Sequence, residues 1–237
     1  ENAMRVVDLS MTVSNWDQNS FAPEETYFKL RPIVNWDDHG FVSNMVEMTV
    51  HAGTHVDSPH HFFRDMPSID QIPADDFMGD AVVVDLTFKG HANARITPED
   101  MEQAEAALAK EGIALEPGLI LLLRTDWPNS KSPLDPSWWN ESPCLTKEAA
   151  EWIVARQPRA VGFDFAQEEK GGEHEYEKAE EILSGAMRVH KAMLPKLTFQ
   201  IENLINLDQL PSTLKIIALP AKWNSESAPA RVIGLID

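Results

Sequence analysis

Short apolar runs, rich in β-branched residues, recur along the chain between polar segments. Runs of this length that are bounded by turn residues are typical of strands buried in a sheet. The first 60 residues and the last 25 are also rich in strand-forming patterns. We predict the clearest strands at residues 81–86, 119–123, 160–165, 214–219 and 231–236.

Two helices are indicated by the residues at which they begin. Thr97 offers an N-cap, Pro98 suits the first helical position, and Asp100 is a carboxylate at the third. Gly112 suits the end of this helix because glycine readily adopts a left-handed conformation. A second helix is predicted for Thr146–Ala155, again with a threonine cap.

The order of these elements predicts the fold class. A third, acidic helix is expected at about residues 176–187, and a helix followed by a strand occurs at 97–123 and at 146–165. We predict an α/β fold, with a mixed β-sheet or open barrel core and helices packed outside it. One domain is expected over residues 4–237, because no linker or break in composition divides it, whereas residues 1–3 resemble the leftover of an expression tag.

Composition narrows the classes of partner. Lys and Arg total 20 and Asp and Glu total 38, so the formal net charge is −18. Such a balance argues against nucleic acid and anionic membranes as partners. No run of eighteen apolar residues occurs, and the one cysteine, Cys144, excludes a disulfide framework and a thiolate zinc site. We therefore expect a cytoplasmic protein, in which any metal is held by imidazole and carboxylate groups.

Four of the eight histidines lie within residues 51–62, together with Asp57. The spacing of His51 and His55 would suit one face of a helix, but Gly53 between them favours a bend instead. On an extended segment, His55 and Asp57 point the same way. Two imidazoles and a carboxylate form a typical site for zinc or manganese with one position open to water. The alternative is a chance cluster of histidines on a polar loop.

The pattern His51-x-Gly-Thr-His55-x-Asp57-x-Pro59-x-His61-Phe62 resembles the signature of the cyclase-like metal-dependent hydrolase family. This family includes bacterial kynurenine formamidase and isatin hydrolase. The resemblance continues in His190 and, twelve residues on, in Glu202 of a Glu-Asn-Leu segment, and then to the end of the chain. It implies a swivelling β/β/α fold.

The resemblance also implies roles for individual residues. His51, His55 and Asp57 would hold a first metal ion, and Asp57 could bridge to a second ion bound by His190 and Glu202. His61 would be the catalytic acid/base. One position departs from the family, because Gln167 stands where relatives often carry a small hydroxyl residue, so a proton relay there is in doubt. His60 has no assigned role.

The function that follows is hydrolysis of a C–N amide bond by a hydroxide held at the metal, with His61 moving the proton. The substrate would be a small aryl formamide or cyclic amide, and the family commonly forms homodimers or homotetramers. Tryptophans in predicted loops could stack on an aryl group, although packing is the better explanation for each of them taken singly. These are Trp16, Trp36, Trp127, Trp138 and Trp139.

Two other functions stay open at this point. His55-x-Asp57 with a distant His190 also satisfies the ligand pattern of a non-haem iron oxygenase. That pattern leaves His51 and His61 without a role, and no arginine follows His190 closely enough to bind an oxoacid co-substrate. The other possibility is a non-catalytic metal-binding protein of the same fold, in which the metal site is closed.

Overall fold

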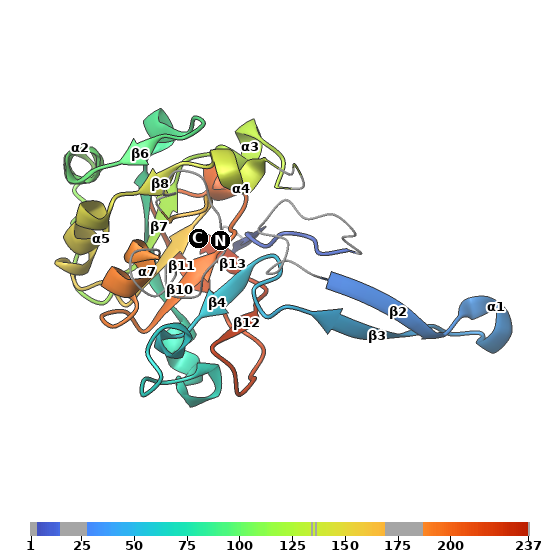
Figure 1. Cartoon of the computed structure of the whole chain (residues 1–237). Helices are drawn as coiled ribbons and strands as arrows, with labels where there is room; N and C mark the ends of the chain where they lie inside the picture. Colours follow the sequence, from blue (N-terminus) through green and yellow to red (C-terminus); the bar gives the residue numbers. More distant parts are fainter. Residues whose placement is uncertain (1–3, 15–27, 134, 136, 169–186, 237) are drawn as a thin grey trace.

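A mixed nine-stranded sheet forms the centre of the computed structural model (Figure 1), with the strand order β1-β13-β11-β5-β7-β9-β10-β4-β12. In that order the strands are Arg5–Asp8, Ile233–Ile236, Thr213–Ile217, Met78–Asp85, Ile120–Arg124, Ala160–Phe163, Phe199–Glu202, His55–Asp57 and Ser227–Pro229. The structure describes residues 4–14, 28–133, 135, 137–168 and 187–236.

The four central strands, β5, β7, β9 and β10, run parallel, and antiparallel pairs flank them on both sides. Parallel neighbours need crossover connections, which here contain α2 (Pro98–Lys110), α5 (Lys147–Val154) and α7 (Arg188–Met193). These helices lie together on one side of the sheet (Figure 1). The predicted α/β fold with a mixed sheet and outer helices is therefore confirmed. No helix in the described part of the chain is long and apolar enough to cross a bilayer.

Alternating side chains of the central strands fill two separate cores. In β5, Val82 and Val84 face the helices, whereas Ala81 and Val83 face the opposite core. Because both faces of these strands are buried, their sequences are continuous apolar runs, and this is why the strands could be predicted from the sequence. Full burial of one such side chain contributes roughly 1.5–3 kcal/mol.

The predicted strands and helix starts are confirmed, with shifts of up to three residues. Thr97 and Asp100 form a capping box at α2, with 2.8 Å between the Thr97 nitrogen and Asp100 Oδ2. Thr146 Oγ1 accepts a hydrogen bond from the Ala149 nitrogen at the start of α5. The third predicted helix, at 176–187, lies outside the described residues except for Met187.

Shorter elements complete the described chain. The hairpin strands β2 and β3 are Phe28–Val34 and Ser43–Met48, and β6 and β8, Arg95–Ile96 and Cys144–Leu145, form a small parallel pair. The remaining α-helices are α1, α3 and α4, at Trp36–His39, Trp127–Ser130 and Trp138–Glu141. Single 3₁₀ turns η1 to η5 lie at Pro59–His61, Ile69–Gln71, Ala74–Phe77, Thr87–Lys89 and Leu207–Gln209.

Two tryptophans predicted to lie in loops are buried in the core, and that prediction was wrong for them. Trp127 and Trp138 belong to α3 and α4, and the Trp127 Nε1–H donates to the Trp138 carbonyl at 3.2 Å. The polar residues around them indicated a loop, but burying two indoles stabilises short helices there. Trp139 packs partly buried on the same core, Trp36 is exposed, and Trp16 lies outside the described residues.

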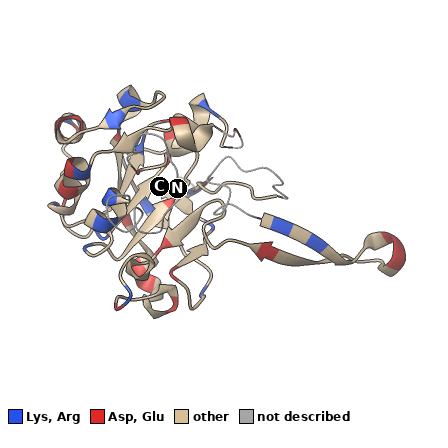
Figure 2. Cartoon of the chain, viewed as in Figure 1, with Lys and Arg blue, Asp and Glu red and all other residues tan. Residues whose placement is uncertain are grey.

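The hairpin of β2, α1 and β3, residues 28–48 and called the arm below, extends away from the body (Figure 1). Gly40 ends α1 at the tip with φ of 70°, a conformation that glycine adopts without strain. Figure 2 shows basic residues on β2 and acidic ones on α1. Large apolar side chains are exposed on the arm: Ile33, Trp36, Phe41, Val42, Met45 and Val46.

Candidate metal centre

A sharp bend at Gly53 leads the chain into β4. Gly53 has a φ of +68°, and a Cβ atom there would lie 2.6 Å from Val13 Cγ2. Both facts restrict the position to glycine. The bend predicted from the sequence is confirmed, and it separates His51 from His55 so that their rings meet edge to face.

Strand pairing brings the first ligand candidates together. His55 and Asp57 alternate with Val56 and therefore share one face of β4, with 3.5 Å between His55 Nε2 and Asp57 Oδ1. The antiparallel register with β10 places Glu202 opposite His55. Glu202 Oε2 consequently lies 3.6 Å from His55 Nε2.

His51 completes a compact group on the other side of Asp57. Its Nδ1 atom is 3.2 Å from Asp57 Oδ1 and 3.3 Å from His55 Nε2. These three atoms are the donor set that the sequence suggested for a first ion.

His190, on α7, lies at the same centre. His190 is buried, and its Nε2 atom lies 2.9 Å from Glu202 Oε1 and 3.8 Å from Asp57 Oδ2. His190 is therefore not a solvent-facing residue. Asp57 thus faces imidazoles with each of its two oxygens, as a bridging carboxylate would.

His61, in the 3₁₀ turn η1, closes the centre from the more exposed side. Its ring centroid lies 4.6 Å from that of His51 and 5.7 Å from that of His190. Donor atoms of His51, Asp57 and His61 lie within 4.8 Å of one another, as do those of His55, Asp57 and Glu202. By distance alone, His61 could therefore serve as a ligand or as an acid/base.

Asp57 has buried oxygens without hydrogen bonds. Within the described chain neither Asp57 oxygen has a hydrogen-bond partner, although imidazole nitrogens of three histidines lie within 3.8 Å of them. Gln200 pairs with Asp57 in the register of β10 and β4, and within the described chain both of its side-chain amide atoms are also buried without a hydrogen-bond partner. A buried carboxylate without hydrogen bonds is costly unless a cation balances it. The donor set therefore fits a metal ion.

Each inner histidine has an acceptor for its second ring nitrogen. His55 Nδ1 lies 2.8 Å from the Gly53 carbonyl, and His51 Nε2 lies 3.7 Å from Glu226 Oε1. In metal sites such contacts fix the tautomer and the orientation of the ring.

His190 Nδ1 makes the equivalent contact with Glu168 Oε1, at 2.6 Å. The sequence interpretation missed Glu168 and Glu226. Their roles depend on contacts between distant segments, and no local motif marks them. The one available signal was that Glu168 is adjacent to Gln167, at the position already marked as unusual.

The electrostatics of the centre favour a cation. Burial lowers the pKa of His51, but nearby carboxylates, chiefly Asp57, outweigh it and raise the pKa to about 10. Burial likewise lowers the pKa of His190, and the nearby carboxylates of Asp57, Glu168 and Glu202 raise it well above its usual value. The imidazoles hold protons here because the carboxylates create a strongly negative potential. A divalent cation would relieve the same potential.

The pKa of His61 moves in the opposite direction. Burial lowers it, Asp57 raises it, and the neighbouring His51 and His190 lower it further, to about 4. His61 is therefore neutral at pH 7. Its behaviour sets it apart from His51 and His190.

Gln167 and His60 occupy different positions relative to the centre. Gln167 is buried, its amide nitrogen donates a short hydrogen bond to Glu202, and it lies 3.3 Å from His190 Nε2. His60 Nδ1 lies 3.2 Å from the Met66 carbonyl, on the rim of a polar hollow of about 400 Å³ that also includes Glu226. Gln167 thus belongs to the centre, whereas His60 contacts the neighbouring loop.

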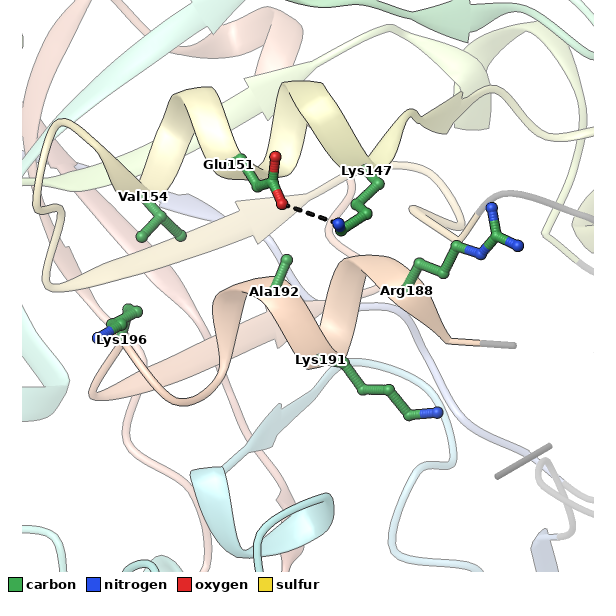
Figure 3. Close-up of a pocket in the computed structure, with 7 residues that line it drawn as sticks. All are labelled: Lys147, Glu151, Val154, Arg188, Lys191, Ala192 and Lys196. Atoms are coloured by element: carbon green, nitrogen blue, oxygen red, sulfur yellow. Dashed lines mark ion pairs between the residues drawn. The ribbon is translucent and has the colours of Figure 1, made fainter. Parts of the chain in front are cut away.

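A second hollow, of about 470 Å³, lies between α5 and α7 and is mostly lined by basic side chains (Figure 3). Lys147 is paired with Glu151 at 3.0 Å, and Arg188 and Lys191 point in different directions. These cations do not converge on one point. None of the residues that line this hollow is a ligand candidate of the metal centre.

Comparison with known proteins identifies several relatives. The family model described as "Putative cyclase" matches residues 7–170. A kynurenine formamidase from Salinibacter ruber is 25% identical over 232 residues, which cover 97% of this chain and 97% of that protein.

Solved structures also resemble this chain over nearly its whole length. Isatin hydrolase A from Labrenzia aggregata, bound to benzyl benzoate, superposes with a TM-score of 0.81 and 26% identity, covering 98% of this chain and 94% of that one. A protein described as a potential metal-dependent hydrolase with cyclase activity has a TM-score of 0.70 and 25% identity, with 99% and 100% of the two chains covered.

Proposed function

This chain belongs to the cyclase family, and from that premise we infer that it is a metal-dependent hydrolase that cleaves the C–N bond of an amide. The family resemblance predicted from the sequence is confirmed. Of the proteins it resembles, one is named for a formamide substrate and another for isatin, a cyclic amide, and hydrolysis of either kind of amide would break a C–N bond.

One observation supports this function most strongly: Asp57 is buried, has no hydrogen bond from the described residues, and is surrounded by histidines. Such a carboxylate is stabilised by a cation. Imidazole nitrogens and carboxylate oxygens are the donors that zinc and manganese accept in catalytic sites.

We propose the following roles. His51, His55 and Asp57 hold one divalent ion, and His190 and Glu202 hold a second ion that shares Asp57. Zinc and manganese both suit these donors. The two oxygens of Asp57 support two ions, because Oδ1 lies 3.2 Å from His51 Nδ1 and 3.5 Å from His55 Nε2, whereas Oδ2 lies 3.8 Å from His190 Nε2. When bound, the metal supplies Lewis-acid chemistry, by polarising the amide carbonyl and lowering the pKa of water.

The proton is moved by His61. As a neutral imidazole it accepts a proton from the attacking water, and as an imidazolium it donates that proton to the amine as the C–N bond breaks. Its place on the more exposed side of the centre suits a group that exchanges protons with substrate. Gln167, which donates to Glu202, orients that carboxylate.

We propose a small aryl formamide or a cyclic aryl amide as the substrate. The relatives named above support an aryl group, and the isatin hydrolase binds benzyl benzoate, which is also aromatic. Phe62 supports the same choice, because its ring lies 4.5 Å from His61 and 5.1 Å from His190 and offers an aromatic surface beside the centre. Trp127 and Trp138 are buried in the core and are not part of this proposal.

Hydrolysis of N-formylkynurenine and isatin, measured in parallel, tests the proposal. The protein is stripped of metal and reloaded with zinc or manganese, and turnover is compared with that of the His61→Ala variant. We expect turnover of one substrate that depends on metal and on His61. Oxygen consumption by an iron-loaded protein would favour the oxygenase instead, and tight metal binding without turnover of any aryl amide would favour a non-catalytic role.

We further propose that the partner of the arm is a second copy of this chain. An isolated two-stranded hairpin is only marginally stable in water, so an extended arm with exposed apolar side chains needs a covering surface. In a two-fold contact each copy contributes the same patch, so the buried area counts the patch twice. This helps the interface reach the roughly 1,200–2,000 Å² of total surface that stable interfaces bury. Lys29 and Arg31 on β2 also suit another copy of a chain whose net charge is −18.

We propose the cytoplasm as the location. The single cysteine, Cys144, is buried and free, which is compatible with a reducing compartment.

A further inference from the structure

Glu168 lies in the turn after β9 and is buried, with 5% of its surface exposed. A buried carboxylate requires donors, and Glu168 has three, all from the start of α7. Its Oε1 atom accepts from the His190 backbone N–H at 2.7 Å and lies 2.6 Å from His190 Nδ1. Its Oε2 atom accepts from the Val189 backbone N–H at 3.2 Å.

The backbone contacts fill the role of a missing cap. The N-cap residue of α7 is Met187, which makes no side-chain cap hydrogen bond, so the first N–H groups of the helix need another acceptor. Glu168 provides it from a different segment. The carboxylate therefore fixes both where α7 begins and where its third residue, His190, lies.

The contact with the imidazole selects a tautomer. Glu168 can only accept at Oε1, so Nδ1 of His190 must carry the proton in that contact. The other nitrogen, Nε2, faces the centre and lies 2.9 Å from Glu202 Oε1, so its lone pair becomes available to an ion when the proton that it shares with Glu202 is displaced. A metal ligand requires this form of histidine.

We propose that Glu168 is the positioning residue of the metal centre, holding His190 in the orientation and tautomer that binds the ion. This inference rests on the proposed function, because it assigns Glu168 to the site that His190 would serve. Carboxylates in this position increase the metal affinity of the histidine they hold, and their removal typically weakens binding 10- to 100-fold.

The test compares Glu168→Gln with the wild type by titration of zinc and manganese against a chromophoric chelator. The amide keeps the size of the side chain but is a weaker acceptor. We expect 10- to 100-fold weaker binding of metal. In the zinc-loaded wild type, histidine NMR should show a downfield Nδ1–H proton, which is missing in His190→Ala and shifted in Glu168→Gln.

Thr146→Ala is the control for general loss of stability. It removes the cap of α5, which packs beside α7, without touching the centre, and should cost about 1 kcal/mol of stability with no change in metal affinity. If Glu168→Gln binds metal as tightly as the wild type, or no more weakly than Thr146→Ala does, the inference is wrong. If the wild type binds neither metal, the proposed function itself fails and this inference fails with it.

Discussion

His55 and Asp57 project from the same face of β4, with 3.5 Å between Nε2 and Oδ1. The strand period of two residues causes this, and the pairing of β4 with β10 adds Glu202 at the same level. Three side chains from two strands are thereby held by backbone hydrogen bonds. The centre is rigid at its base, and the groups that complete it, His51, His61 and His190, come from connecting segments and from α7.

Asp57→Asn should remove the stabilisation of the protein by metal. At a metal concentration 100 times the dissociation constant, binding stabilises the wild type by about 2.7 kcal/mol. The variant lacks the carboxylate charge that the two proposed ions would share, so zinc should stabilise it much less than it stabilises the wild type. Thermal unfolding with and without zinc measures this difference. Asp80→Asn is the control, because Asp80 is exposed and paired with Lys215 away from the centre. Equal stabilisation of Asp57→Asn and the wild type would contradict a metal role for Asp57.

His61→Ala should reduce kcat by roughly 10²- to 10⁴-fold and leave metal affinity unchanged, because in the proposed function the residue moves a proton and does not bind the ion. Steady-state kinetics and metal titration on the same preparation check both parts. His60→Ala, whose ring contacts the Met66 carbonyl, should behave like the wild type. A large loss of metal affinity in His61→Ala would make His61 a ligand instead, which its distance to His51 and Asp57 also permits.

The sequence predicted those parts of the centre that lie close together along the chain. His51, Gly53, His55 and Asp57 fall within one bend and one strand, so residue type and strand periodicity were enough. His190 and Glu202 were reached only through the spacing of a known family. Glu168 could not be predicted, because its contact with His190 exists only after α7 has packed beside the end of β9.

The elements of the fold also divide into those that the sequence predicted and those that it did not. The central strands were visible because they are buried on both faces and therefore apolar throughout. The burial of Trp127 and Trp138 was not visible, because whether an indole in a polar segment packs inward depends on distant residues. The apolar arm was likewise missed: its residues alternate like those of an ordinary strand, and only the structure shows that nothing in the described chain covers them.

Gly53→Ala should destabilise the protein more than Gly112→Ala. Both residues have a positive φ, of 68° and 78°, which costs alanine about 1 kcal/mol or more. A Cβ atom at Gly53 would also meet Val13 Cγ2 at 2.6 Å, whereas nothing lies within 4 Å at Gly112. Urea unfolding of the two variants measures the difference. Equal destabilisation would show that the contact with Val13 relaxes without cost.

Glu105 should contribute to stability at neutral pH and lose that contribution in acid. Hydrogen bonds from Arg156, at 2.6 and 2.8 Å, lower the pKa of Glu105 below its ordinary value of 4.5. The contribution is therefore present above pH 4.5 and disappears as the pH falls through the lower, folded-state pKa. Because both groups are partly exposed, Glu105→Gln should cost only about 0.5 kcal/mol at pH 7.

Urea unfolding at pH 7 and at pH 3 checks this prediction. The difference in the free energy of unfolding between the wild type and Glu105→Gln, called the gap below, should become smaller at the lower pH. Glu102→Gln, at an exposed position of the same helix, should show a smaller gap at pH 7. A gap for Glu105→Gln that is unchanged by pH would mean that packing of the side chain, and not its charge, links α2 to Arg156.

Replacing Ile33 and Val46 on the arm by serine should dissociate the proposed dimer without unfolding the subunit. Both side chains are more than half exposed, at 60% and 51%, so the isolated chain gains little from them and their apolar surface contributes only when a partner covers it. Sedimentation velocity should show a dimer for the wild type and a monomer for the double variant, with similar unfolding of the subunit. Phe88→Ser, at a 41% exposed position outside the arm, is the control and should remain dimeric. A wild type that sediments as a monomer at all concentrations would rule out a second copy as the partner of the arm. A dimer that survives the double substitution would place the interface elsewhere on the chain.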